Sequence, residues 1–306
     1  MSASYTWQNF LTVDSLKLRK LDDEWYILGN TSTRATITDF EDMTDEEYEV
    51  ETDPRTIYYN TLKEVKKLKI CNLVFIDTCI CNLFKHKHNA WWAASELEDL
   101  VFENCDTSAI TDMYELFANA GSLKHLDITC FNTSAVTKMG YMFCNCGSLE
   151  AIDVSHMDTS NVEDMTAMFI SCSSLTELDL HNFNTSKVKS FLLMFVDCNK
   201  LTTLDLSMFN TSSLTDIGVM FDGCSLIKTL NLNNWTTDKV TNMSSMFNNC
   251  NSLENLDIRH FVVRDDCDIT NMFGRDNALA KTIPGLKLPE GLMDRLFPPV
   301  PPNNQE

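Results

Sequence analysis

Residues Leu201 to Leu226 read LTTLDLSMFNTSSLTDIGVMFDGCSL, and this stretch decides the fold because it recurs. The preceding stretch, Leu175 to Lys200, reads LTELDLHNFNTSKVKSFLLMFVDCNK in the same frame. Working outward from these two, seven units of 26 residues follow one another, and each opens on an apolar residue: Leu97, Leu123, Leu149, Leu175, Leu201, Ile227 and Leu253. A short unit of this kind cannot bury its own apolar face, but stacked neighbours can. The repeat therefore predicts a solenoid.

Each unit divides into three pieces. The opening Leu-x-x-Leu-x-Leu alternates at its end, as in Leu126-Asp127-Ile128, which predicts a short strand. Asn-Thr-Ser then predicts a corner, because asparagine side chains bond to nearby backbone groups. Met, Met, Phe and Cys follow at spacings of three, four and seven, which favours one face of a short helix. The fold class predicted is α/β, a solenoid with one short strand and one short helix per repeat.

The regions outside the array repeat poorly. Residues 1–60 are interpreted as an N-terminal cap or small subdomain with an acidic loop, and residues 61–96 as a divergent first repeat or junction. The seven units occupy 97–273. Residues 274–306 are expected to form a C-terminal cap followed by a Pro-rich, extended tail.

The unit resembles the BspA-like class of leucine-rich repeats. Two stretches match the signature of that class closely: Leu204 to Ser212, LDLSMFNTS, and Asn242 to Cys250, NMSSMFNNC. The resemblance covers about 97–273 and implies a leucine-rich-repeat solenoid. It also implies a non-enzymatic role, since known members of the class are mostly surface adhesion and interaction proteins. Related repeats also occur in intracellular and large-virus proteins.

Charge and the chain ends bound the function further. Asp and Glu number 44 against 24 Lys and Arg, giving a net charge of −20. Binding to nucleic acid or to an anionic membrane needs a positive face, so neither is expected. The N-terminus has no basic and apolar leader pattern, and no apolar run is long enough to span a bilayer. An intracellular location is predicted, with a cell or virion surface reached by a non-classical route as the alternative.

The cysteines suggest packing more than chemistry. Cys146, Cys172, Cys198, Cys224 and Cys250 recur at the repeat period, as buried free thiols would. Equivalent positions in adjacent units have poor geometry for disulfides. A second set could supply zinc-type ligands, although its spacing is not that of common zinc motifs: Cys71, Cys79, Cys81, His86 and His88. Neither a metal nor a cofactor is predicted, and zinc binding by Cys79, Cys81, His86 and His88 is left open.

Acidic residues form a ladder along the predicted strands. Each stands between two inward apolar residues and should point away from the core. Repulsion between like charges at strand spacing predicts that some of their pKa values rise. With two variable neighbours they form the candidate partner-binding face: Asp127, Asp153, Asp179, Asp205, Asp257, Glu177 and His181. One hypothesis is an acidic stripe for a basic partner. The other is that each aspartate bonds locally and merely defines the repeat.

No catalytic constellation emerges from the motifs. The sequence has no Gly-rich phosphate loop after a strand and no His-Glu-x-x-His or Gly-x-Ser-x-Gly motif. The Asn-Thr-Ser sequons at Asn132, Asn184 and Asn210 are interpreted as stacked corners. The predicted function is a non-enzymatic protein–protein interaction module. The alternative is a structural or scaffolding component of a large assembly such as a virion.

Overall fold

The computed structural model describes residues 96–298 continuously, together with 65–71 and 73–75. Outside these ranges it places the backbone of five further strands: β1 (Arg19–Leu21), β2 (Glu24–Leu28), β3 (Arg34–Ala35), β6 (Lys85–His86) and β7 (Asn89–Trp92). Most of the predicted N-terminal cap and the Pro-rich tail after Pro298 lie outside the described residues. In the described part, no helix has the length and apolar character needed to cross a bilayer.

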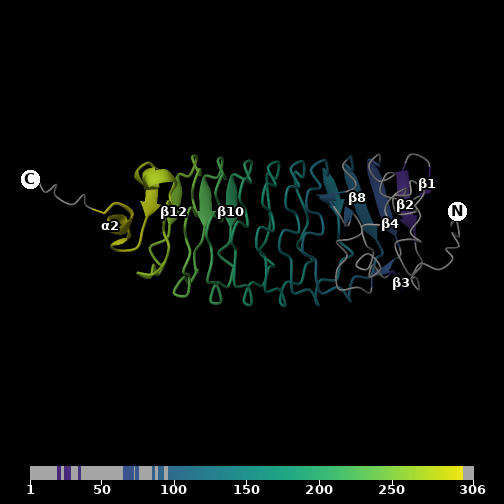
Figure 1. Ribbon diagram of the computed structural model, residues 1–306, viewed down its shortest axis with the longest axis horizontal. Helices are drawn as coiled ribbons and strands as arrows, with labels where there is room; N and C mark the ends of the chain where they lie inside the picture. The colour runs from purple at the N-terminus through teal and green to yellow at the C-terminus, as the bar shows by residue number, and fades with distance from the viewer. Residues whose placement is uncertain are drawn as a thin grey trace, which may run out of the picture.

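The chain winds into an elongated solenoid, as predicted, whose seven 26-residue turns stack along the long axis (Figure 1). Its cross-strands are β4 (Lys67–Cys71), β5 (Val74–Phe75), β8 (Asp99–Glu103), β9 (His125–Asp127), β10 (Thr203–Asp205), β11 (Thr229–Asn231), β12 (Asn255–Asp257) and β13 (Gly285–Lys287). One sheet has the strand order β1-β2-β4-β8-β9, and a second has the order β10-β11-β12-β13. The small pairs β3-β5 and β6-β7 complete the set. Apart from β1-β2 and β6-β7, the pairs are parallel.

Each residue of one turn lies opposite its equivalent in the next, so identical side chains stack. Leu204 faces Leu230 in the β10-β11 register, and Leu100 faces Leu126 in β8-β9. On the side away from the strands, phenylalanine rings stack with centroids 5.3–5.8 Å apart from Phe117 to Phe273. These rings and the inward leucines are buried in one continuous core.

The prediction of a short helix in each repeat is wrong. In residues 97–273 the segment that carries Met, Met, Phe and Cys consists of consecutive turns. Its N–H groups alternate in direction: that of Leu116 donates within the turn to Met113 at 3.2 Å, whereas that of Phe117 donates to Met142 of the next turn at 2.9 Å. An α-helix would use all of its interior N–H groups internally and leave none for the neighbouring turn. The apolar spacing of three, four and seven fits both structures.

Positive φ angles mark the same departure from helical geometry. Glu115 has a φ of 55°, Asn119 one of 68°, and Asn145 of the next turn one of 58°. The position equivalent to Glu115 is left-handed in every later turn as well, even where it is Leu193 or Val219. Left-handed residues interrupt a right-handed helix. The repeat therefore folds as a β-solenoid with few helices, not as a strand-and-helix array.

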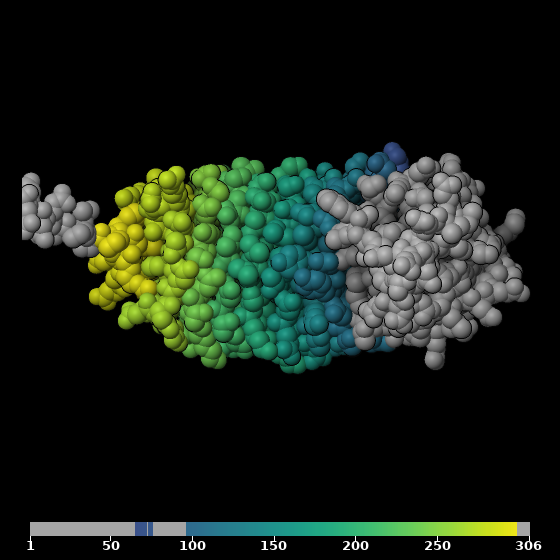
Figure 2. Space-filling view, in the orientation of Figure 1, coloured from purple at the N-terminus to yellow at the C-terminus, as the bar shows by residue number. Residues whose placement is uncertain are grey.

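Residues after Gly274 cover the C-terminal end of the stack (Figure 2). They comprise the 3₁₀ helix η5 (Arg275–Lys281), strand β13 and helix α2 (Leu292–Leu296). β13 pairs with β12, and Ile283, Leu292 and Leu296 are buried against the core. The last strand edge and the last apolar layer of the solenoid are thereby covered.

Candidate functional site

The aspartate ladder lies on the strand face, and every member is held by a local turn. A carboxylate oxygen of Asp153 accepts hydrogen bonds from the N–H and hydroxyl of Ser155 at 2.9 and 2.7 Å. The other ladder aspartates accept the N–H two residues further on in the same way: Asp127, Asp179, Asp205 and Asp257. The structure therefore confirms that each of these aspartates forms a local hydrogen bond.

These bonds overturn the predicted rise in pKa. Hydrogen bonds from Ser155 lower the pKa of Asp153, and hydrogen bonds from Ser207 lower that of Asp205. The pKa of Asp179 is lowered by its hydrogen bond with His181, against a smaller raising effect of Asp153. The bonded carboxylate is stabilised more by its donors than it is destabilised by the neighbouring charge. The hollow described below therefore keeps its negative charge at neutral pH.

Strand pairing fails in the middle of the ladder. Within residues 97–273, the two turns between β9 and β10 contribute no strand. The pairs that do form place an aspartate opposite a neutral or basic residue: Val101↔Asp127, Asp205↔Asn231 and Asp257↔Lys287. The three missing pairings would place aspartate opposite aspartate, from Asp127 to Asp205. Like charges directly opposite destabilise strand pairing, and we attribute the gap to that repulsion.

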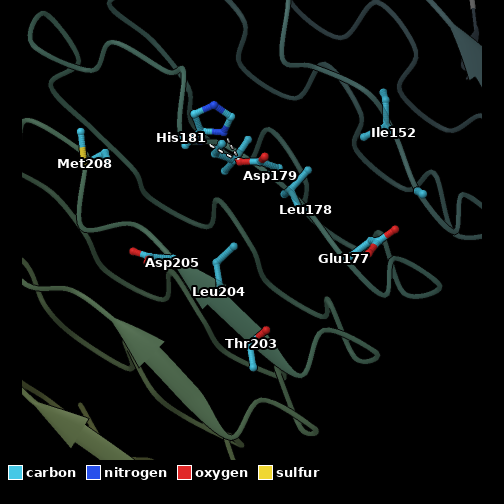
Figure 3. Close-up of a pocket in the computed structure, with 11 residues that line it drawn as sticks. Ile152, Glu177, Leu178, Asp179, His181, Thr203, Leu204, Asp205 and Met208 are labelled. Carbon is cyan, nitrogen blue, oxygen red and sulfur yellow. Dashed lines mark hydrogen bonds and ion pairs between the residues drawn. The ribbon is translucent and has the colours of Figure 1, made fainter.

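A hollow of about 490 Å³ opens on the strand face at this gap (Figure 3). Ile152 and Leu178 form part of its lining and are half-buried. Their equivalents in the paired turns are buried, with exposed fractions of 6% or less: Leu126, Leu204, Leu230 and Leu256. Met208 extends the apolar lining at one side with 69% of its surface exposed.

Four of the seven predicted partner-face residues line the hollow: Glu177, Asp179, His181 and Asp205. The Nδ1 of His181 lies 2.6 Å from a carboxylate oxygen of Asp179, and both side chains are exposed. Asp127, Asp153 and Asp257 are not among the lining residues. Asp257 is instead paired with Arg259 at 2.8 Å and with Lys287 at 3.3 Å.

Sequence reasoning missed the apolar half of this site. Met208 stands out in the aligned units, because the same repeat position is otherwise Asn104, Cys130, His156, Asn182, Asn234 and His260. Ile152 and Leu178 carry no such signal, because they match the inward leucines of every other turn. A signal for the hollow was available in the uninterrupted run of four aspartates from Asp127 to Asp205.

The cysteine ladder is buried and free, as expected. Each thiol donates to the carbonyl oxygen of the phenylalanine 29 residues before it, as Cys172 does to Phe143 at 3.1 Å. The others repeat this bond at 3.1–3.3 Å: Cys146, Cys198, Cys224 and Cys250. The thiols thus tie adjacent turns together. Burial raises the pKa of Cys172 and Cys224 to about 12, which makes these thiols unreactive.

The second cysteine set is only partly visible. Cys71 is buried, and its sulfur lies 3.9 Å from a carboxylate oxygen of Glu103. The side chains of Cys79, Cys81, His86 and His88 lie outside the described residues. No group of three potential metal ligands is present in the part of the chain that the structure describes.

The corner asparagines Asn132, Asn184 and Asn210 accept the N–H of the serine two residues on, each at 3.1 Å.

Comparison with known proteins yields one family. The model of the family described as "Mycoplasma protein of unknown function, DUF285" matches residues 82–202 and 176–285. The two matches overlap and together span well over half of the chain, including every turn of the solenoid that borders the hollow. A search of curated proteins finds no match.

Proposed function

The chain belongs to the DUF285 family, whose description assigns no activity, and we propose that this member is a non-enzymatic protein-binding module. The hollow over residues 151–208 is its proposed binding surface. The observation that carries the proposal is the apolar lining: Ile152 and Leu178 are only half-buried, whereas the equivalent leucines of the paired turns are buried, and Met208 is exposed beside them. Exposed apolar patches rimmed by polar residues are typical of protein interaction sites.

The backbone around the hollow supports a binding role. The corner and turn segments on both sides remain hydrogen-bonded from turn to turn, as when the N–H of Phe169 donates to Met194 at 3.0 Å. The phenylalanine stack passes behind the hollow without interruption. The surface is therefore held in place before a partner arrives, which reduces the entropy lost on binding.

The chemistry of the hollow favours binding over catalysis. General acid–base catalysis works best with a group whose pKa lies near the operating pH. The pKa values of Asp179 and Asp205 are shifted away from neutral pH, because both carboxylates accept local hydrogen bonds. The resemblance to BspA-like repeats, whose known members are mostly adhesion and interaction proteins, supports the same class of function. An adhesion-like role on a cell surface would be one form of it.

The proposal is tested by identifying a partner and reconstituting the pair. A protein captured by the full chain is purified, and its affinity is measured for the wild type, for Met208→Glu and for the control Val262→Glu. Both methionine and valine are more than half exposed, at 69% and 52%, so neither substitution should unfold the chain. We expect Met208→Glu to weaken binding about tenfold or more and Val262→Glu to leave it within about twofold. Equal affinities for all three proteins would remove the hollow from the binding function.

A further inference from the structure

The chemistry of the partner can be specified further, on the premise that the proposed function holds. We propose that the hollow binds an extended segment of a partner protein in which Lys or Arg residues flank a large apolar residue. The apolar residue would lie against Ile152, Leu178 and Met208. The basic groups would pair with Glu177, Asp179 and Asp205.

The ion pairs of the strand face point to a cation in the middle of the ladder. Towards the N-terminus, Glu98 pairs with Lys124 at 2.7 Å and with Lys66 at 3.6 Å. Towards the C-terminus, Glu254 pairs with Lys228 at 3.5 Å and Asp257 with Lys287. The chain thus supplies its own basic partners for acids at both ends of the strand face.

The acids of the hollow differ. Among the described residues, Glu177 and Asp205 form no ion pair, and Asp179 is bonded to His181 of its own turn and to no Lys or Arg. Two lysines near Asp179 in sequence pair elsewhere: Lys189 binds Glu163 at 2.8 Å, and Lys187 binds the side chain of Asn161 at 2.6 Å. Lys200, five residues before Asp205, forms no ion pair with the acids of the hollow. A negative surface with an apolar lining, which no Lys or Arg of the described residues neutralises, attracts a complementary cationic segment.

Asp257 shows how such a cation would be held. Its carboxylate takes Arg259 from two residues along the same turn and Lys287 from the facing strand β13. In the hollow the position of Arg259 is occupied by His181 beside Asp179 and by Ser207 beside Asp205. Neither supplies the guanidinium that Arg259 brings to Asp257. Asp257 and Lys287 also face each other in the paired strands β12 and β13, where opposite charges stand in place of the like charges of the unpaired turns.

The apolar floor selects among cationic ligands. A metal ion or a simple polyamine would satisfy the carboxylates but would leave Ile152, Leu178 and Met208 in contact with water. A lipid surface or a nucleic acid would bring negative charge toward Glu177, Asp179 and Asp205. A peptide in which basic residues flank apolar ones satisfies both features, because the apolar side chains can face the lining while the long side chains of Lys or Arg bend back to the carboxylates beside it.

Fluorescein-labelled peptides and the full chain test the proposal by anisotropy. The probe is Gly-Ser-Arg-Leu-Arg-Leu-Arg-Ser-Gly. One control peptide replaces each Leu by Ser and keeps the charge, and another replaces each Arg by Glu and keeps the apolar residues. We expect the probe to bind about tenfold more tightly than the Ser peptide, and the Glu peptide not to bind measurably. Equal binding of the probe and the Ser peptide would overturn the proposal, because charge alone would then explain the attraction.

Matched variants locate the binding. Asp179→Asn with Asp205→Asn removes two charges from the hollow and should fold, because Asn231 already stands at the equivalent position and accepts the same turn bond at 3.3 Å. Glu290→Gln with Asp294→Asn removes two exposed charges from the C-terminal cap. We expect the first pair to weaken probe binding about tenfold and the second by less than about twofold. Equal losses in both would overturn the proposal.

Two further outcomes separate this inference from the proposed function. If a reconstituted partner is sensitive to Met208→Glu but insensitive to the Asp179→Asn and Asp205→Asn pair, the cationic-segment inference fails and the binding module stands. If neither set of substitutions changes partner affinity, both fail. Sedimentation of the chain alone covers a second copy as the occupant. Self-association that is lost in the Asp179→Asn and Asp205→Asn protein would overturn the assignment to a separate partner.

Discussion

The turns from residue 149 to residue 200 and those from residue 201 to residue 257 have nearly the same repeat but different strand faces. In the second region β10, β11 and β12 pair in parallel, and the inward leucines are buried. In the first, no strand forms, and Ile152 and Leu178 are half-buried. Asp205 faces Asn231 in the paired region, whereas aspartates succeed one another in the open one. A surface feature of a repeat protein can thus follow from charge at one position of the unit.

The rest of the unit does not distinguish the two regions. The rings of Phe169 and Phe195 have centroids 5.8 Å apart, and so do those of Phe195 and Phe221. Cys198 and Cys224 both donate to a phenylalanine carbonyl of the preceding turn, at 3.2 and 3.1 Å. Strand pairing is therefore separable from the core packing that stacks the turns.

The largest expected effect tests this separation. Phe169 lies behind the region without strands, residues 149–200, and Phe221 behind the paired region, residues 201–257. Both rings are fully buried, and each is replaced by Ala. We expect each substitution to lower the free energy of unfolding by about 3–5 kcal/mol, because each leaves a large cavity in the same stack. Urea unfolding followed by circular dichroism measures both. A loss behind the open region that is smaller by more than about 2 kcal/mol would show that its core is looser too, and the comparison would have to be redrawn.

A second pair of substitutions should separate the regions. Leu230→Ala removes a buried side chain from β11 and is expected to cost about 2–5 kcal/mol. Leu178→Ala removes its half-buried equivalent, and we expect the cost to stay below about 2 kcal/mol, since less apolar surface returns to water. The same urea experiment compares them. Equal costs would mean that Leu178 is as well packed in solution as Leu230.

An aspartate added in the paired region should weaken the strand pairing there. Asn231→Asp joins the aspartate run to Asp257 and places like charges opposite each other in β10-β11, where Asp205 already faces that position. We expect a loss of about 0.2–1 kcal/mol and faster amide hydrogen exchange in β10 and β11. Asn233→Asp serves as the control, because it adds the same charge two residues away. Unchanged exchange in the Asn231→Asp protein would contradict repulsion as the cause of the gap.

The stacked architecture could be predicted from the period alone, because equally spaced identical residues bury their apolar side chains by stacking in register. Leu204 lies against Leu230 and Phe195 against Phe221 in this way. The helix could not be excluded, since the spacing of Met139, Met142, Phe143 and Cys146 fits consecutive turns as well as a helix. The acidic half of the hollow was visible as the ladder of Asp179 and Asp205. Its apolar half depends on which strands fail to pair, and the inward leucines have the same sequence pattern in both regions.

The smallest expected effect concerns the order in which the ladder aspartates titrate. Hydrogen bonds with His181 and Ser207 lower the pKa of Asp179 and Asp205, whereas Asp257 also has two cations, and its pKa is lowered furthest. A carboxyl whose pKa is lower in the folded state stabilises the fold above its unfolded pKa, and this contribution is lost as the pH falls through the folded value. All three contributions should therefore be intact at neutral pH and decline below about pH 4, with that of Asp257 lost last. Carboxyl-carbon NMR titration of the wild type, with Asp257→Asn to assign its resonance, measures the order. Protonation of Asp257 at or above the pH at which Asp179 titrates would show that Arg259 and Lys287 stabilise the Asp257 carboxylate no more than the local bonds stabilise that of Asp179.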